Sequence, residues 1–180
     1  MVKKNMNTDS MNKLFWLFWF VTTIYTGILC GFMISHSLIL GRFFSWAVEN
    51  GVSLSNFIAF RKSSNYSFYY GVYYSFLWIH FLIGLIWTVL TFLSKRERIE
   101  KAFAIIAGLS SFWVGLIFSI SDIDEAEEAV MTGTADASMK QLFVAINVLT
   151  HTSFAIIYLA SFILLLLIAY RNLEFKKLES

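Results

Sequence analysis

Four long stretches of the chain are apolar and carry no charged side chain. They cover residues 14–40, 67–94, 102–121 and 141–170. Each stretch reaches or exceeds the roughly 20 residues that an α-helix needs to cross about 30 Å of hydrocarbon. The pattern predicts four transmembrane helices in an all-α, integral membrane four-helix bundle, with residues 1–180 as a single membrane domain.

Two more polar segments are expected on the side of the membrane opposite to the chain termini. Residues 41–66 combine aromatic side chains with isolated charges around an Asn50–Gly51 turn signal, which predicts short helices at the membrane interface. Residues 122–140 are acidic and prone to form a helix with a break at Gly133. We expect this second segment to be a solvated helical cap, and the alternative is a partner-binding or cation-attracting surface.

Composition and charge agree with a membrane protein. The chain is 58% hydrophobic and 14% charged, with a mean hydropathy of +0.66, whereas soluble proteins carry about 25% charged residues. Ten of the 14 Lys and Arg residues lie at the two termini and in the second loop: Lys3, Lys4, Lys13, Lys95, Arg96, Arg98, Lys101, Arg171, Lys176 and Lys177. This asymmetry predicts that both termini are cytoplasmic. The net charge of +2 follows from these loop charges and does not indicate nucleic acid binding.

Two histidines lie deep inside the apolar stretches, where ionisable side chains are costly and often functional. His80 and His151 have nearly equal offsets from the outer ends of their stretches, so we expect them to face the bundle interior at one depth. Helical spacing places Tyr73 on the face of His80 and Asn147 on the face of His151. Such a site would bind haem b, a quinone or a metal ion. The alternative is that each histidine is a packing residue, hydrogen-bonded to a neighbouring helix.

A second candidate site lies nearer the outer surface. His36 is at the outer end of the first stretch, and Asp122 and Asp124 follow the third, so these three residues are candidate metal ligands. The alternative for the two acids is a helix-end cap. Cys30 is the only cysteine, which excludes an internal disulfide or a thiol pair within the chain.

Small residues at helical spacing predict where the helices pack closely. Gly27 in the first stretch, and Gly108, Ser111 and Gly115 in the third, form such stripes. We expect Leu at Gly27 or Gly115 to disturb the bundle more than Leu165→Ala, at a position expected to face lipid. The chain has no proline, so none of the four helices is expected to carry a proline break.

The layout, together with two short stretches, carries a family resemblance. Residues 119–124 read SISDID and residues 147–151 read NVLTH. The layout resembles the anthrone oxygenase-like family (domain of unknown function 1772), which are small four-helix membrane proteins with a long first outer segment and a tight second loop. Members tend to show an Asn-x-Pro-x-Asn-like motif where this chain has SISDID, and an Asn followed by Arg where it has Asn147 and Thr150. The resemblance covers most of the chain as layout and implies a common architecture.

Three classes of function are compatible with these observations. The small size and aromatic-rich faces favour a subunit of a larger membrane complex of oxidase or monooxygenase type, with lipid and other membrane subunits or a second copy as partners. The alternative is a membrane oxidoreductase that acts on a lipophilic substrate, with His80 or His151 as base or ligand. A transporter or channel is disfavoured by the lack of internal repeats and of a charged pore lining. No residue is specified as catalytic by its sequence context alone.

Overall fold

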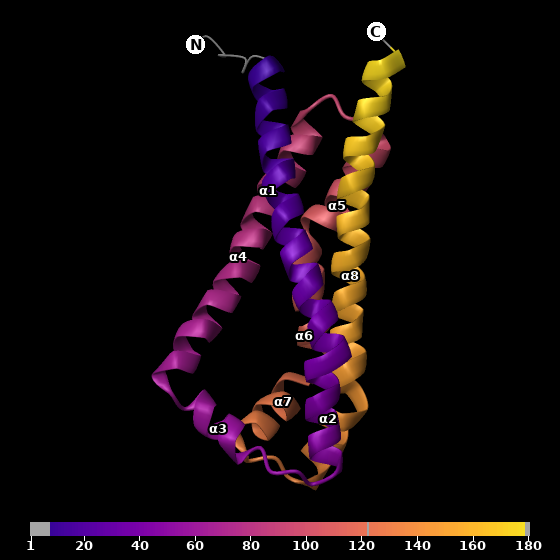
Figure 1. The fold of residues 1–180 in the computed structure, drawn as a ribbon. Helices are drawn as coiled ribbons and strands as arrows, with labels where there is room; N and C mark the ends of the chain where they lie inside the picture. Colours follow the sequence, from indigo (N-terminus) through magenta and orange to yellow (C-terminus); the bar gives the residue numbers. More distant parts are fainter. Residues whose placement is uncertain (1–7, 122, 179–180) are drawn as a thin grey trace.

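The computed structural model describes residues 8–121 and 123–178, and this part of the chain is helical with short connections (Figure 1). The elements are α1 (Thr8–Ser35), the π-helix η1 (His36–Leu40), α2 (Gly41–Glu49), α3 (Ser55–Arg61), α4 (Ser64–Leu93), α5 (Arg98–Gly108), α6 (Ser110–Ile120), α7 (Ile123–Thr132) and α8 (Ala137–Leu178). Lys3 and Lys4, which enter the charge balance, and Asp122 lie outside the described residues. The start of α1 and the end of α8 lie at the same end of the molecule, which we call the inner end.

Three helical segments of the described chain are long and apolar enough to cross a membrane. They are Asp9–Glu49, Asn65–Leu93 and Ala137–Leu173, and the pair α5–α6 makes a fourth if its two bent halves count as one span. The prediction of an all-helical chain with apolar segments of membrane-spanning length is therefore confirmed. The four-span bundle in a membrane stays a prediction.

The first span is longer than the sequence predicted. Instead of ending at residue 40, it continues through η1 into α2, and Asp9–Glu49 form one segment of 41 residues. The helix α2 is therefore not a separate interfacial helix; it packs against α8 through buried residues that include Phe44 and Ala47. The expected turn follows at Gly51, whose positive φ of 64° favours glycine, and then the short helix α3.

The third span is bent by 50° at Leu109, although the chain has no proline. Gly108 of α5 crosses Gly84 of α4 so closely that a Cβ atom at Gly108 would lie 2.8 Å from the carbonyl oxygen of Gly84. The first residue after the bend is Ser110. Its Oγ donates a hydrogen bond to the backbone carbonyl of Ala107, just before the bend, at 3.0 Å. Glycine and serine close together in a helix, here Gly108 and Ser110 on either side of Leu109, are a common cause of such kinks.

The bend changes which face of α6 points inward. Ser111 lies in the interior, but Gly115 and Ser119 are exposed, and nothing lies within 4 Å of a Cβ atom at Gly115. Conversely, Leu165 is fully buried rather than facing lipid. The orientation expected for Gly115 and for Leu165 is therefore wrong. For Gly115 the reason is the bend of the third span, whereas Leu165, on α8, is buried in an apolar cluster with Phe15 and Trp87.

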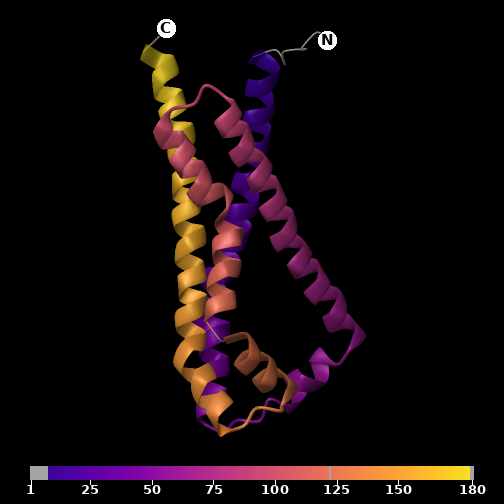
Figure 2. The ribbon, with the colours of Figure 1, turned by 180° about the vertical axis from the view of Figure 1, so that it is seen from behind.

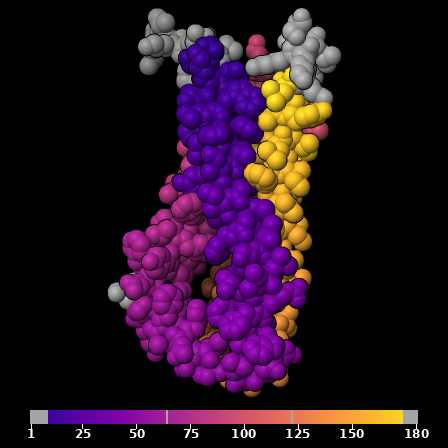
Figure 3. All heavy atoms as spheres, in the orientation of Figure 1, coloured from indigo at the N-terminus to yellow at the C-terminus, as the bar shows by residue number. Residues whose placement is uncertain are grey.

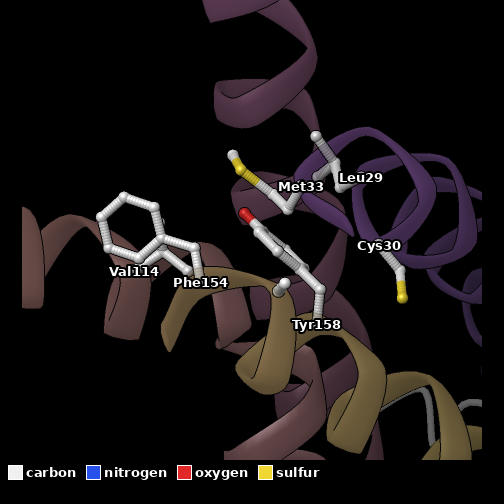
Figure 4. Close-up of a cluster of buried hydrophobic side chains, with 7 residues drawn as sticks. Leu29, Cys30, Met33, Val114, Phe154 and Tyr158 are labelled. Atoms are coloured by element: carbon white, nitrogen blue, oxygen red, sulfur yellow. The ribbon is translucent and has the colours of Figure 1, made fainter. Parts of the chain in front are cut away.

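Buried apolar side chains form three clusters along the molecule. The innermost consists of Phe15, Trp87, Ala104, Ala107, Leu165 and Ile168. The middle cluster is formed by Leu29, Cys30, Met33, Val114, Phe154, Ala155 and Tyr158, and Figure 4 shows the ends of the Met33 and Tyr158 side chains near one another. The outermost consists of Phe44, Ala126, Val130, Met131 and Phe143. It buries one face of the acidic helix α7, which ends at Thr132, directly before the predicted break at Gly133 (φ 80°).

The inner end of the molecule is tied together by Arg96, in the loop between α4 and α5. Its guanidinium group donates to Asn172 of α8 at 2.7 Å and to Asn12 of α1 at 2.6 Å. The same group lies 3.8 Å above the ring of Phe15, a cation–π contact. The tight second loop therefore holds three of the long helices together.

The outer half of α4 leaves the bundle. None of its side chains between residues 65 and 79 is buried, whereas His80, Gly84 and Trp87 further along the helix are. Figures 1 and 2 show this half diverging from α1 and α8, and Figure 3 shows a hollow between α4 and the continuous α1–α2 helix. The outer half of the molecule is therefore open sideways, between α1 and α4.

The crossing of α4 and α5 provides a test of the packing. We expect Gly84→Ala to destabilise the protein by about 1–3 kcal/mol, because the added methyl group would overlap the backbone of Gly108. Gly71→Ala is the matched control on the same helix, since nothing lies within 4 Å of its Cβ position. Thermal unfolding in detergent measures the difference. Equal melting of the two variants would show that the crossing is looser than described.

Candidate functional site

A chain of hydrogen bonds crosses the buried centre of the molecule. The Tyr158 hydroxyl lies 2.8 Å from Ser111 Oγ, which lies 2.7 Å from Nδ1 of His80. On the other side of the ring, His80 Nε2 lies 2.9 Å from Thr26 Oγ1, which donates to the carbonyl of Thr22 at 2.8 Å. The residues come from α8, α6, α4 and α1 in turn, so the chain connects every candidate span.

The direction of these hydrogen bonds follows from the last acceptor. A carbonyl can only accept, so the single hydroxyl hydrogen of Thr26 points to Thr22, and Thr26 accepts from Nε2–H of His80. A charged imidazole without a counter-ion is costly in an apolar interior, so the ring is neutral and its Nδ1 accepts from Ser111. Ser111 must then accept from the hydroxyl of Tyr158. All hydrogen bonds of the chain run in one direction, which strengthens each of them.

This arrangement bears directly on the predicted role of His80. The side chain is fully buried and both ring nitrogens are hydrogen-bonded. A haem iron or another metal at His80 would have to displace Thr26 or Ser111. The geometry therefore favours the alternative that His80 is a packing residue bonded to neighbouring helices. Tyr73 lies apart from this network, in the open half of α4, with its ring centroid 5.0 Å from that of Phe32.

The second polar site is built on the π-helix η1. Its first residue, His36, stacks on His151 of α8, with ring centroids 4.0 Å apart and ring planes at 28°. The next residue, Ser37, is hydrogen-bonded to Thr152 at an Oγ–Oγ1 distance of 2.7 Å. Single π-helical turns within α-helices occur frequently at functional sites. Here the π-turn presents two consecutive polar side chains to α8.

Asn147 holds the two elements of this site together. Its Nδ2 donates to the carbonyl of Gly41 at 2.9 Å and to Ser45 Oγ at 3.0 Å. Its own backbone carbonyl lies 2.9 Å from Nδ1 of His151. Because that carbonyl can only accept, the ring hydrogen of His151 is on Nδ1, and Nε2 carries a lone pair. Within the described chain, Nε2 of His151 has no hydrogen-bond partner, and neither ring nitrogen of His36 has one.

The structure thus pairs the predicted residues differently from the expectation. His36, not His80, lies opposite His151. His80 lies at the level of Tyr158, with ring centroids 5.9 Å apart, seven residues and about 10 Å along α8 from His151. Both histidines are buried, but the equal depth expected for them is wrong. The outer end of α4 stops well short of the outer end of α8 (Figure 1), so equal offsets do not give equal heights.

Only two of the three residues of the predicted outer metal site, His36 and Asp124, lie in the described part of the chain. His36 is stacked on His151, and Asp124 is exposed on α7. Over residues 8–121 and 123–178, no group of three or more His, Cys, Asp or Glu side chains is close enough to hold a metal ion. Metal binding by these residues stays a prediction that depends on Asp122, outside the described residues.

Sequence reasoning missed the residues that attach η1 and α2 to α8. Ser37, Gly41, Ser45 and Thr152 were not singled out. A signal was present, because Ser37, Gly41 and Ser45 follow each other at four-residue spacing and mark one small, polar helix face. The π-turn itself has no comparable signature in the sequence.

Aromatic side chains connect the histidine pair to the open side of the molecule. The ring of Phe32 lies 6.2 Å from that of His36 and 5.0 Å from that of Tyr73 on α4. Phe32 is 44% exposed. Phe154 is buried and makes a T-shaped contact with His151, with ring centroids 5.6 Å apart. The pair therefore lies between the buried ring of Phe154 and the partly exposed ring of Phe32, which in turn contacts Tyr73 of α4.

Comparisons of the chain with protein-family models, with curated proteins and with solved structures found no significant match. The resemblance to the anthrone oxygenase-like family therefore stays a prediction, and the site is interpreted from its geometry.

The direction of the central hydrogen-bond chain predicts different losses of stability for substitutions of Ser111 and Tyr158. Ser111→Ala leaves both the Tyr158 hydroxyl and His80 Nδ1 unpaired, so we expect a loss of about 1–3 kcal/mol in stability. Tyr158→Phe removes only the first donor, and the Ser111–His80 bond survives, so we expect about 0.5–1.5 kcal/mol. Unfolding in detergent measures both. Ser119→Ala, at an exposed position of the same helix, is the control. An equal or larger loss in Tyr158→Phe would contradict the assigned direction.

Proposed function

We propose that the chain is an integral membrane protein that crosses the membrane four times, with both termini cytoplasmic. Three long apolar segments and the bent pair α5–α6 support four crossings. The ten-to-four division of Lys and Arg residues between the two sides supports the orientation. In this arrangement the histidine pair lies in the outer half of the membrane, beside the opening between α1 and α4.

We further propose that this site binds a lipophilic molecule with an acidic hydroxyl group, such as a phenol or hydroquinone. The observation that carries the proposal is the fixed tautomer of His151, whose Nδ1–H is bound to the carbonyl of Asn147 while Nε2 remains an acceptor. An acceptor without a partner in largely apolar surroundings selects for a ligand that donates a hydrogen bond. The aromatic rings of Phe32 and Tyr73 provide apolar contacts along the route from the membrane.

The chemistry that this geometry supports is proton transfer from the ligand hydroxyl to His151. The O–H bond breaks, the proton binds to Nε2, and a phenolate faces an imidazolium. The bond from Nδ1 to the carbonyl of Asn147 then becomes charge-assisted and stabilises the imidazolium. The stacked ring of His36 has one donor and one acceptor in its neutral form, so it also suits the carbonyl group of a quinone.

The other cofactors considered from the sequence fit the histidine pair less well. Two axial haem ligands approach the iron from opposite faces of the porphyrin, whereas His36 and His151 lie ring on ring at 4.0 Å. A phenol or quinone needs no such opposition. Membership of a larger oxidase- or monooxygenase-type complex stays a prediction, because the exposed apolar side chains suit lipid as well as a partner subunit.

The orientation is tested by labelling single cysteines. On a Cys30→Ala background, Glu125→Cys on α7 should react only from the outside, and Lys95→Cys in the second loop only from the cytoplasm. Both positions are exposed and neither takes part in an ion pair given by the structure. Membrane-impermeant maleimide applied to vesicles of known sidedness gives the measurement. Labelling with the opposite sidedness would overturn the proposed topology.

The ligand is tested with a decyl-substituted hydroquinone and the protein in lipid nanodiscs. His151→Asn keeps a donor near the carbonyl of Asn147 but removes the Nε2 acceptor, so we expect binding to weaken about tenfold or more. Quenching of tryptophan fluorescence follows the binding. The dimethyl ether of the same hydroquinone, which has no hydroxyl, is expected to bind weakly to both proteins.

Two controls separate this result from a loss of the fold. Ser153→Ala lies on the exposed face of α8, two residues from His151, and should bind like the unaltered protein. The melting temperature of His151→Asn in detergent checks that the variant is folded. Equal binding of the hydroquinone by His151→Asn, or equal binding of the ether by the unaltered protein, would refute the proposed role of Nε2.

A further inference from the structure

A pocket of about 280 Å³ lies at the outer end of the molecule, where α3, the start of α4 and α7 meet. Its lining includes the side chains of Ile58, Arg61, Tyr66, Glu128 and Met131. The histidine pair on η1 and α8 does not belong to it. The pocket is therefore separate from the site described above, and the chemistry of its lining is different.

Arg61 is the central polar group of this pocket. Its Nη2 donates to Oε2 of Glu128 at 2.8 Å, and its guanidinium lies 5.2 Å from the centre of the Tyr66 ring. The side chain is only 14% exposed. Its second terminal nitrogen, Nη1, is buried and has no hydrogen-bond partner in the described chain. A buried donor without an acceptor is costly, and for a charged group the cost is larger.

The side chains that line the pocket favour an anion as the missing acceptor, although Glu127 of α7, outside the lining, also interacts with Arg61. Burial lowers the pKa of Arg61, but the hydrogen bond to Glu128 and the contacts with Tyr66 outweigh this, so its pKa is raised and it stays charged. Glu128 is paired with Arg61, and the adjacent Lys62, which also lines the pocket, is exposed and has no ion-pair partner among the described residues. The lining thus carries one positive charge in excess.

The location of the pocket indicates where the anion comes from. It opens beside Tyr66 and Tyr70, at the outer end of the apolar segment Asn65–Leu93. Tyrosine side chains are typical of the level at which lipid head groups meet the hydrocarbon. The apolar side chains of Ile58 and Met131 line the same pocket as the cations. A molecule with a charged head next to an apolar chain matches such a lining.

We propose that this pocket binds the phosphodiester group of a membrane phospholipid, with Nη1 of Arg61 and the ammonium group of Lys62 as donors. Arginine presents its donors in a planar fork that suits phosphate oxygens, and here one arm of the fork is already held by Glu128. The other arm, Nη1, is thereby restricted in direction and has no acceptor within the described chain. The lipid bridges α3 and α7 at the outer surface.

The test measures the binding of phosphatidylglycerol to the full chain by native mass spectrometry from detergent micelles. Arg61→Gln should weaken binding about tenfold or more, because a charge-assisted hydrogen bond is lost. Arg42→Gln is the matched control, an exposed arginine on α2 outside the pocket. Diacylglycerol with the same acyl chains lacks the phosphate. It should therefore bind to the unaltered protein no more tightly than it binds to Arg61→Gln.

A third variant separates binding from a structural role of the ion pair. Glu128→Gln breaks the same ion pair as Arg61→Gln, but the amide oxygen of Gln can still accept from Nη2 and keep the guanidinium in place. The lining loses a negative charge, so binding should be unchanged or tighter. Equal weakening in both variants would overturn the proposal, as would equal binding by Arg61→Gln and Arg42→Gln. Equilibrium dialysis with inorganic phosphate distinguishes the source. Binding of phosphate with loss in Arg61→Gln, but no lipid binding, would overturn the lipid as ligand and assign the pocket to a soluble phosphate compound.

Discussion

A polar side chain buried in an apolar interior must find its hydrogen-bond partners within the protein, and His80 finds both of its partners on other helices. This constraint explains several features of the fold together. On α4, His80 and Gly84 are one turn apart, and each meets the third span, through Ser111 and Gly108 respectively. The bend between these two residues of the third span lets one helix pair make a glycine crossing and a histidine contact in succession. The heights of α1 and α8 relative to α4 then follow from Thr26 and Tyr158.

The two histidine environments differ in what remains available for chemistry. The network around His80 is complete and ends in the carbonyl of Thr22, which cannot pass a proton on, so the hydrogen bonds cannot reverse their direction. Such a network does not relay protons. The pair of His36 and His151 keeps an unused acceptor and lies beside the open outer half of α4. At the opposite, inner end of the molecule, Arg96 closes the gap between the helices through its hydrogen bonds to α8 and α1. The saturated hydrogen bonds and the unused acceptor thus lie at different levels of the same molecule.

The sequence predicts those features that depend on neighbours along the chain. The apolar stretches, the turn at Gly51 and the break at Gly133 are local signals, and all appear in the structure. The grouping of Asn147 with His151 was also predictable, because residues four apart share a helix face. The partner of His151 was not predictable in this way. It depends on where each helix begins and how far α4 leans outward, which are properties of the tertiary structure. The bend at Leu109 has a local signal in Gly108 and Ser110, but the close approach of Gly108 to Gly84 involves two residues that are distant in sequence.

The π-turn of the first span has a consequence for reading this chain and its variants. A π-turn is equivalent to one residue inserted into an α-helix, and one residue rotates everything beyond it by about 100°. A single helical wheel drawn through α1 and α2 therefore misassigns the face of every residue after Leu40. The buried positions Phe44 and Ala47 need a separate helical wheel for α2, whose rotation is set by the attachment of η1 to α8. In an alignment of related chains, a one-residue gap between His36 and Gly41 would mark a change of the site itself rather than a change in loop length.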